Sequence, residues 1–273
     1  MDYLAELKRQ RAVRLLVPLF FLSGMTALVY QTIWARQLQL VFGTSQFAIA
    51  TVLAAFMAGL AAGGFMMARY ADGATRPLRI YGLLEIGIGL YALVFPVLLK
   101  AATPLYLGFY ASQQPGPLSF GLFQFVLLGA LLLAPTTCMG ATLPLLGRFV
   151  TARLGDAGDR IGLLYGVNTF GAVLGIVVAG FFLLPSAGLE LTTWLAAGAN
   201  VALGAAALSL SRWSGETDQA PPEVEVDLDL PPNKSLAPVM LVAALTGFAA
   251  LVYEVSWFRL MGLILGGSAY AFS

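Results

Sequence analysis

The sequence predicts an all-α polytopic membrane protein that crosses the bilayer about seven times. Of its 273 residues, 59% are hydrophobic and 11% are charged, and the mean hydropathy is +0.83. A soluble core of this length cannot bury so much apolar surface. The second observation is a series of apolar stretches that approach or exceed the roughly 20 residues a spanning helix needs. The third is an internal repeat, which separates one set of six stretches from the beginning of another.

The repeat relates the first apolar stretch to the last. Residues 24–48, GMTALVYQTIWARQLQLVFGTSQFA, return without a gap as residues 247–271, GFAALVYEVSWFRLMGLILGGSAYA. Identical residues recur in register along the two copies, among them Gly24/Gly247, Tyr30/Tyr253, Trp34/Trp257 and Arg36/Arg259. A duplication this far apart makes the intervening sequence one repeat unit. We therefore expect the second unit to be truncated at residue 273.

The individual spans follow from apolar length. A basic arm at residues 1–14 precedes the first span, and no small-residue cleavage site follows it, which favours an uncleaved helix. The first repeat, residues 15–210, and the start of the second, residues 236–273, together contain seven predicted helices. The helices are expected at residues 15–34, 47–68, 80–99, 118–134 with a continuation to 146, 161–185, 189–210 and 236–257.

Residues 211–235 form the one strongly polar segment, with six acidic residues and two Pro-Pro pairs. Such a segment cannot bury enough apolar surface to fold alone, so we interpret it as a linker between the repeats. Of the 15 Lys and Arg residues, this arrangement leaves only Arg36, Lys100 and Arg259 on the side opposite the N-terminus. The positive-inside rule then places the N-terminus and the linker in the cytoplasm.

Residue usage excludes several chemistries. The chain has no His and a single cysteine, Cys138, which excludes an internal disulfide, a Cys/His zinc site and a His-based triad. No Gly-rich nucleotide loop occurs in a strand, turn and helix setting. A net charge of +1 gives no reason to expect nucleic acid as a partner. We therefore expect no catalytic, cofactor-binding or metal-binding residue in this chain.

Polar side chains inside the spans form the candidate solute path. Gln31 shares a helical stripe with Gly24 and Ala27, and Glu254 takes the equivalent place in the second copy. Small residues let a neighbouring helix approach, so both polar side chains should face protein. An ionisable residue within a span is by default a functional-site hypothesis. The alternative is that Glu254 reaches interfacial water or pairs with an arginine such as Arg36.

Two further spans add a residue each to this path. Glu85 has glycines three residues before and four residues after it on the same face, so it should point into the bundle. It is either a station for a cation or the acceptor of a structural hydrogen bond. Asn168 lies on a stripe with Gly171 and Gly175, which indicates helix packing, with a cavity lining as the alternative.

Aromatic pairs precede the basic residue that closes each copy of the repeat. This pattern is typical of anchors at the membrane interface, and stacking on a substrate is the alternative. The expected interfacial anchors are Tyr30, Trp34, Arg36, Tyr253, Trp257 and Arg259.

Residues 135–144, PTTCMGATLP, place two prolines and a glycine within one apolar stretch. A broken helix is tolerated in a membrane where its backbone lines a cavity or is covered by protein. This segment is a second candidate binding region.

Three blocks carry a family resemblance: the duplicated stretch, MGATLPLLGR at residues 139–148, and LYGVNTFGAVLGIVVAGFFLLP at residues 164–185. They resemble the membrane region of bacterial fused major-facilitator-like/spermidine synthase proteins. The resemblance implies a major-facilitator-like six-helix repeat in the cell inner membrane. It also implies a downstream aminopropyltransferase-like domain that uses decarboxylated S-adenosylmethionine and a diamine, and this sequence does not contain that domain.

Two functions are therefore expected to compete. In one, the membrane helices bind or translocate a small, polyamine-related cation. In the other, they anchor an enzyme domain to the lipid bilayer without transporting anything. In either case we expect this chain alone to have no enzymatic activity.

Overall fold

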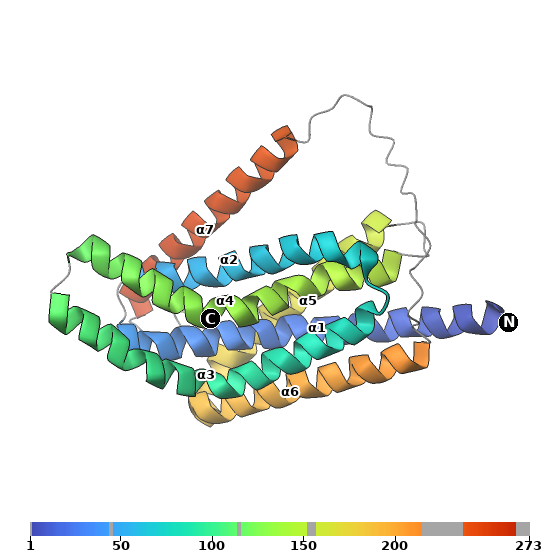
Figure 1. Ribbon diagram of the computed structural model, residues 1–273, viewed down its shortest axis with the longest axis horizontal. Coiled ribbons are helices and arrows are strands. Elements are labelled where there is room, and N and C mark those ends of the chain that lie inside the picture. The colour runs from blue at the N-terminus through green and yellow to red at the C-terminus, as the bar shows by residue number, and fades with distance from the viewer. Residues whose placement is uncertain (1, 44–45, 114–115, 152–156, 215–236, 266–273) are drawn as a thin grey trace.

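The computed structural model describes residues 2–43, 46–113, 116–151, 157–214 and 237–265. Within these ranges the backbone is helical apart from short turns, and it contains no strand. A short 3-10 turn, η1, and a π-helical turn, η2, join longer helices (Figure 1). The elements are α1 Asp2–Phe42, α2 Gln46–Tyr70, η1 Ala71–Gly73, α3 Pro77–Gln113, α4 Pro117–Thr151, α5 Ala157–Val177, η2 Val178–Leu183, α6 Leu184–Ser214 and α7 Ala237–Leu265.

Six helical segments in the described ranges are long and apolar enough to cross a membrane, which confirms the predicted all-α membrane class. The longest, Gly158–Ser214, runs through α5, η2 and α6 over 57 residues. A straight helix of that length would measure about 86 Å, nearly three times the hydrocarbon thickness. Gly188 interrupts it with a φ of 71°, a conformation that glycine adopts without steric cost. On either side of this break, α5 and α6 both pack against α1.

The helices are longer than the apolar runs predicted. α1 begins at Asp2, so the basic arm is helical from its second residue, and Ala12 within it is fully buried. At its other end α1 continues eight residues past Trp34 to Phe42. Hydropathy identifies the part of a helix that matches the hydrocarbon layer, and helical turns can continue into the interfacial region.

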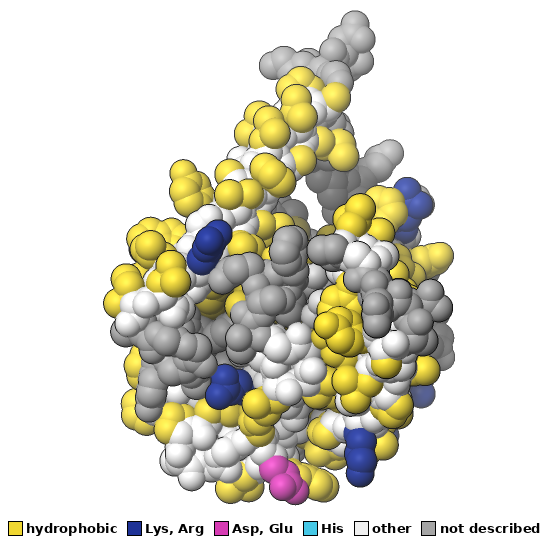
Figure 2. Space-filling model, turned by 90° about the vertical axis from the view of Figure 1, so that its left-hand side faces the viewer, with side chains coloured by type: hydrophobic (Ala, Val, Ile, Leu, Met, Phe, Trp, Pro, Cys, Tyr) yellow, Lys and Arg dark blue, Asp and Glu magenta, His cyan; other side chains and the backbone are white. Residues whose placement is uncertain are grey.

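The outside of the bundle is apolar. Large hydrophobic side chains are exposed along the helices, including Phe65 at 61%, Val126 at 68% and Phe170 at 67%. Figure 2, which shows one end of the molecule, has few charged side chains among the hydrophobic ones. In a soluble protein such a surface would cause aggregation, whereas in a bilayer it faces lipid.

Three helix pairs make the most extensive contacts: α1 with α5, α2 with α4, and α3 with α6. Glycines allow the close approach. A Cβ atom placed on Gly63 of α2 would lie 1.9 Å from the Thr137 carbonyl oxygen, and one on Gly171 of α5 would lie 2.0 Å from the Phe21 carbonyl oxygen. These contacts confirm that the small-residue stripe of residues 168–175 packs against another helix.

The second candidate binding region, residues 135–144, is not a broken helix. α4 continues through both of its prolines. Pro135 cannot donate to the Leu131 carbonyl four residues earlier, and the Tyr91 hydroxyl of α3 donates to that carbonyl instead, at 2.6 Å. The segment packs against α2, so the structure makes it a helix contact and the prediction of a broken helix there is wrong.

α7 stands at an angle to the other helices (Figure 1). No residue in its apolar stretch is buried, and its contact with α2 is small compared with the contacts among the other described helices. The predicted linker lies outside the described residues except for its first four positions, which belong to α6.

Candidate functional site

A layer of polar side chains separates two apolar core clusters. One cluster surrounds Trp34 and Phe95, and the other surrounds Phe20 and Leu78. Between the two clusters, α1 contributes Ser23, α3 contributes Glu85 and α6 contributes Asn200, and all three are buried. The bundle therefore contains one polar layer crossed by three helices.

Close packing of α3 on α6 places Glu85 opposite Asn200. A Cβ atom on Gly204 would lie 2.5 Å from the Gly82 carbonyl oxygen, and one on Gly89 would lie 2.9 Å from the Ala197 carbonyl oxygen. These contacts lie on either side of the Glu85 and Asn200 pair. The glycines thus fix the distance between the two helices that hold it.

Each oxygen of the Glu85 carboxyl group accepts one hydrogen bond. Ser23 Oγ donates to Oε1 at 2.5 Å, and Asn200 Nδ2 donates to Oε2 at 2.9 Å. Glu85 is 1% exposed, and no Lys or Arg of the described chain forms an ion pair with it. A buried carboxyl group therefore ties three helices together without a cationic side chain to neutralise it.

Two tyrosines complete the site. Tyr30 lies within electrostatic range of Glu85, and the Tyr81 hydroxyl lies beside the carboxyl group without hydrogen-bond geometry to it. We call Ser23, Tyr30, Tyr81, Glu85 and Asn200 the Glu85 cluster. Three buried atoms of this cluster have no hydrogen-bond partner among the described protein atoms: Tyr30 Oη, Tyr81 Oη and Asn200 Oδ1. Buried polar groups are normally paired, so the cluster has unused bonding capacity.

That unused capacity includes acceptors for a hydrogen-bond donor. A carboxylate and an amide oxygen only accept hydrogen bonds, and a tyrosine oxygen can accept as well as donate. A primary ammonium group carries three N–H donors and a positive charge, so it matches both the acceptors and the charge. The cluster is thus suited to hold a cation.

The Glu85 cluster lies well inside the bundle. Counted at 1.5 Å per residue, Glu85 is about 9 Å from Arg79, Ser23 about 14 Å from Arg14, and Asn200 about 18 Å from Arg212. Since the hydrocarbon layer is about 30 Å thick, the cluster lies near its middle when these arginines reach one interface.

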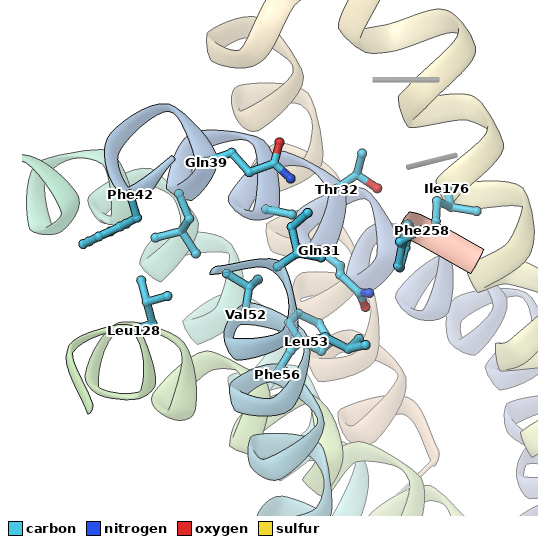
Figure 3. Close-up of a pocket in the computed structure, with 13 residues that line it drawn as sticks. Gln31, Thr32, Gln39, Phe42, Val52, Leu53, Phe56, Leu128, Ile176 and Phe258 are labelled. Carbon is cyan, nitrogen blue, oxygen red and sulfur yellow. The ribbon is translucent and has the colours of Figure 1, made fainter. Parts of the chain in front are cut away.

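Gln31 lies in a different place. It lines a narrow cleft of about 30 Å³ between α1, α2 and α4, together with Thr32 and Gln39. Figure 3 shows its amide beside Leu53, with Phe258 of α7 at the rim of the cleft. The Gln31 Oε1 atom is buried without a partner in the described protein. Glu85 does not line this cleft.

The other two predicted path residues are also separate from Glu85. Asn168 Nδ2 donates to the Phe20 carbonyl oxygen at 3.1 Å, so it joins α5 to α1. Glu254 is partly exposed on α7. Gln31, Glu85, Asn168 and Glu254 form no hydrogen bond with one another in the described structure. The sequence predicted that Glu85 is buried, and its hydrogen-bond partners, Ser23 and Asn200, are not among the predicted path residues.

The interfacial-anchor prediction is wrong for Tyr30 and Trp34. Both side chains are 0% exposed, and their rings stack on each other with centroids 5.2 Å apart. Trp34 also stacks on Phe95 of α3 at 5.0 Å. The prediction failed because it placed the helix end near Arg36, whereas α1 continues to Phe42 and the pair lies inside the bundle.

The remaining anchors stay predictions. Tyr253 is 67% exposed and Trp257 is 58% exposed on α7, and Arg259 is exposed as well. Arg36 is partly exposed.

Ser23, Tyr81 and Asn200 were missed as site residues. For Asn200 a signal existed, because Ala197, Asn200 and Gly204 share one helical stripe, as do Asn168 and its glycines. For Ser23 and Tyr81 no comparable signal existed, because a serine and a tyrosine are ordinary in a membrane helix.

Comparison with known proteins finds no family model, no curated protein and no solved structure that matches the chain. The architecture and the site together define the class: a multi-pass α-helical membrane protein with a buried carboxyl group in a polar cluster.

Proposed function

We propose that this chain is a solute-binding membrane domain in which the Glu85 cluster holds a small cation. The single observation that carries the proposal is the buried Glu85 carboxyl group, which accepts hydrogen bonds from α1 and α6 but has no paired Lys or Arg side chain in the described structure. A carboxyl group in a membrane interior is costly, and such residues generally serve ion or solute pathways. The unpartnered tyrosine and amide oxygens supply further acceptors for the same cation.

The proposed architecture is a major-facilitator-like half of six spans, followed by the first helix of a second half. Counting the turn at Gly188 as a reversal makes seven crossings, with α5 and α6 as separate spans. A half built from two inverted three-helix repeats relates α1 to α4, α2 to α5 and α3 to α6. Exchanging the two repeats maps the α1/α5 pair onto the α4/α2 pair and the α3/α6 pair onto itself. The three helix pairs with the most extensive contacts in this bundle are therefore consistent with two inverted repeats.

The proposed solute is a small amine, in line with the resemblance to fused major-facilitator-like/spermidine synthase proteins. The test measures binding of putrescine and spermidine to the full-length protein in lipid nanodiscs. Loss of one charge-assisted contact costs about 1.5–3 kcal/mol, so Glu85→Gln should weaken binding by about tenfold or more. Glu190→Gln removes the same charge from an exposed position of α6 and should leave binding unchanged.

The alternative function is a membrane anchor for an aminopropyltransferase-like domain. The observation that favours it is that side chains of the bundle already donate to both carboxyl oxygens, which is sufficient for a purely structural link. Under this alternative the wild-type protein binds neither amine, and Glu85→Gln lowers thermal stability alone. That result would refute the cation site.

A further inference from the structure

A polar cavity lies at one end of the α3/α6 pair, away from the Glu85 cluster. It has a volume of about 550 Å³, including its open mouth. Three of its five lining residues are arginines, and none is acidic: Arg76, Arg79, Leu208, Ser211 and Arg212. Ser211 is 5% exposed, so the floor of the cavity is polar and the rim is basic.

The fold brings these arginines together for a local reason. α3 begins at this end of the bundle and α6 ends there, so the two helices run antiparallel. A Cβ atom on Gly82 would lie 3.0 Å from Leu208 Cγ. Arg79 is one turn before Gly82, and Arg212 is one turn after Leu208, which places both guanidinium groups at the same cavity.

Arg79 and Arg212 place two like charges at one cavity, and these repel each other unless an anion neutralises them. Guanidinium groups bind phosphate through paired N–H donors, and the first turn of α3 adds the positive end of a helix dipole. The cavity also lies at the boundary of the apolar spans, since one begins at Pro77 and another ends at Ser214. This is the depth of phospholipid headgroups.

We propose that this cavity binds a phosphate group, supplied by the headgroup of an anionic phospholipid. Basic pockets between membrane helices are suited to such headgroups. The inference is independent of the cation site, because it rests on different residues and concerns the opposite charge. A dissolved phosphate ion has the same chemistry, and the experiment separates the two sources.

The test uses the full chain, purified in a mild detergent and titrated separately with phosphatidylglycerol, phosphatidylcholine and inorganic phosphate. Bound lipid is measured by native mass spectrometry, and phosphate binding by calorimetry. A basic residue near an anionic lipid surface contributes about 1 kcal/mol, or about fivefold. The double variant Arg79→Gln/Arg212→Gln should therefore bind phosphatidylglycerol about 25-fold more weakly than the wild type.

The matched control is Arg11→Gln/Arg14→Gln, which removes two exposed charges from α1 outside the cavity. It should retain wild-type affinity, and phosphatidylcholine should bind weakly to every variant. Binding of inorganic phosphate that depends on Arg79 and Arg212, without binding of phosphatidylglycerol, would support the phosphate site with a soluble source. Equal phosphatidylglycerol affinity in both double variants and the wild type, with no phosphate binding, would overturn the proposal.

Discussion

Replacement of Gly171 by alanine tests how tightly α5 is seated on α1. A Cβ atom on Gly171 would lie 2.0 Å from the Phe21 carbonyl oxygen, and ordinary contact begins at 3.4 Å. The two helices would have to separate by the difference, 3.4 minus 2.0, or 1.4 Å. Gly175, one turn further, is equally close to α1, at 2.2 Å from the Met25 carbonyl oxygen, so a small tilt cannot relieve the clash.

The magnitude follows from two opposing effects. Alanine favours the helix over glycine by up to about 1 kcal/mol. Overpacking of a tight contact costs about 1–3 kcal/mol. Gly166, on the same helix, is exposed and has no atom within 4 Å of its Cβ position. Gly166→Ala should therefore stabilise the protein, whereas Gly171→Ala should be about 1–3 kcal/mol less stable than Gly166→Ala.

The measurement is thermal or SDS-induced unfolding in detergent micelles, followed by circular dichroism, for wild type and both variants. Helix content at low temperature checks that each variant folds. If Gly171→Ala stabilises the protein as much as Gly166→Ala does, α5 is not seated on α1 as described.

Three further substitutions test other parts of the structure. Trp34→Ala should lower the unfolding free energy by about 3–5 kcal/mol, because it removes a fully buried ring. Trp257→Ala, at an exposed position, should change it by about 0.5 kcal/mol or less. Equal losses of unfolding free energy in chemical unfolding would contradict the buried position of Trp34. Ser23→Ala removes the donor to Glu85 Oε1 and should cost about 1–3 kcal/mol in the same assay; an unchanged midpoint would argue against that hydrogen bond. The cytoplasmic location of the linker is predicted from charge, and its Asp227 lies outside the described residues. With Cys138 replaced by serine, Asp227→Cys should resist labelling by an impermeant thiol reagent in intact cells. Rapid labelling would reverse the predicted topology.

The sequence predicted the class and the burial of Glu85 because both depend on local information. Apolar length is a property of each segment, and glycines one turn away from Glu85 mark the face of α3 that meets another helix. Glu85 is 1% exposed, which confirms the prediction that it points into the bundle.

The partners of Glu85 could not be predicted from the sequence. Ser23 lies 62 positions from Glu85, and Asn200 lies 115 positions away. Which helix lies beside which depends on the whole bundle, so periodicity within one helix cannot identify such a pair. Gln31, Asn168 and Glu254 were grouped with Glu85 because each is polar within a span, but each lies against different neighbours.

The two copies of the repeat show how far a motif determines its own surroundings. Tyr30 and Trp34 are fully buried in α1, whereas Tyr253 and Trp257, their equivalents in α7, are 67% and 58% exposed. The difference lies in the neighbours, since Trp34 packs on Phe95 of α3 and α7 has no such helix beside it in the described structure. If the repeat reflects a second half with the same packing, a helix equivalent to α3 would cover Tyr253 and Trp257. Their exposure would then fall to that of Tyr30 and Trp34, and Glu254, the equivalent of Gln31, would line a cleft beside the helices equivalent to α2 and α4.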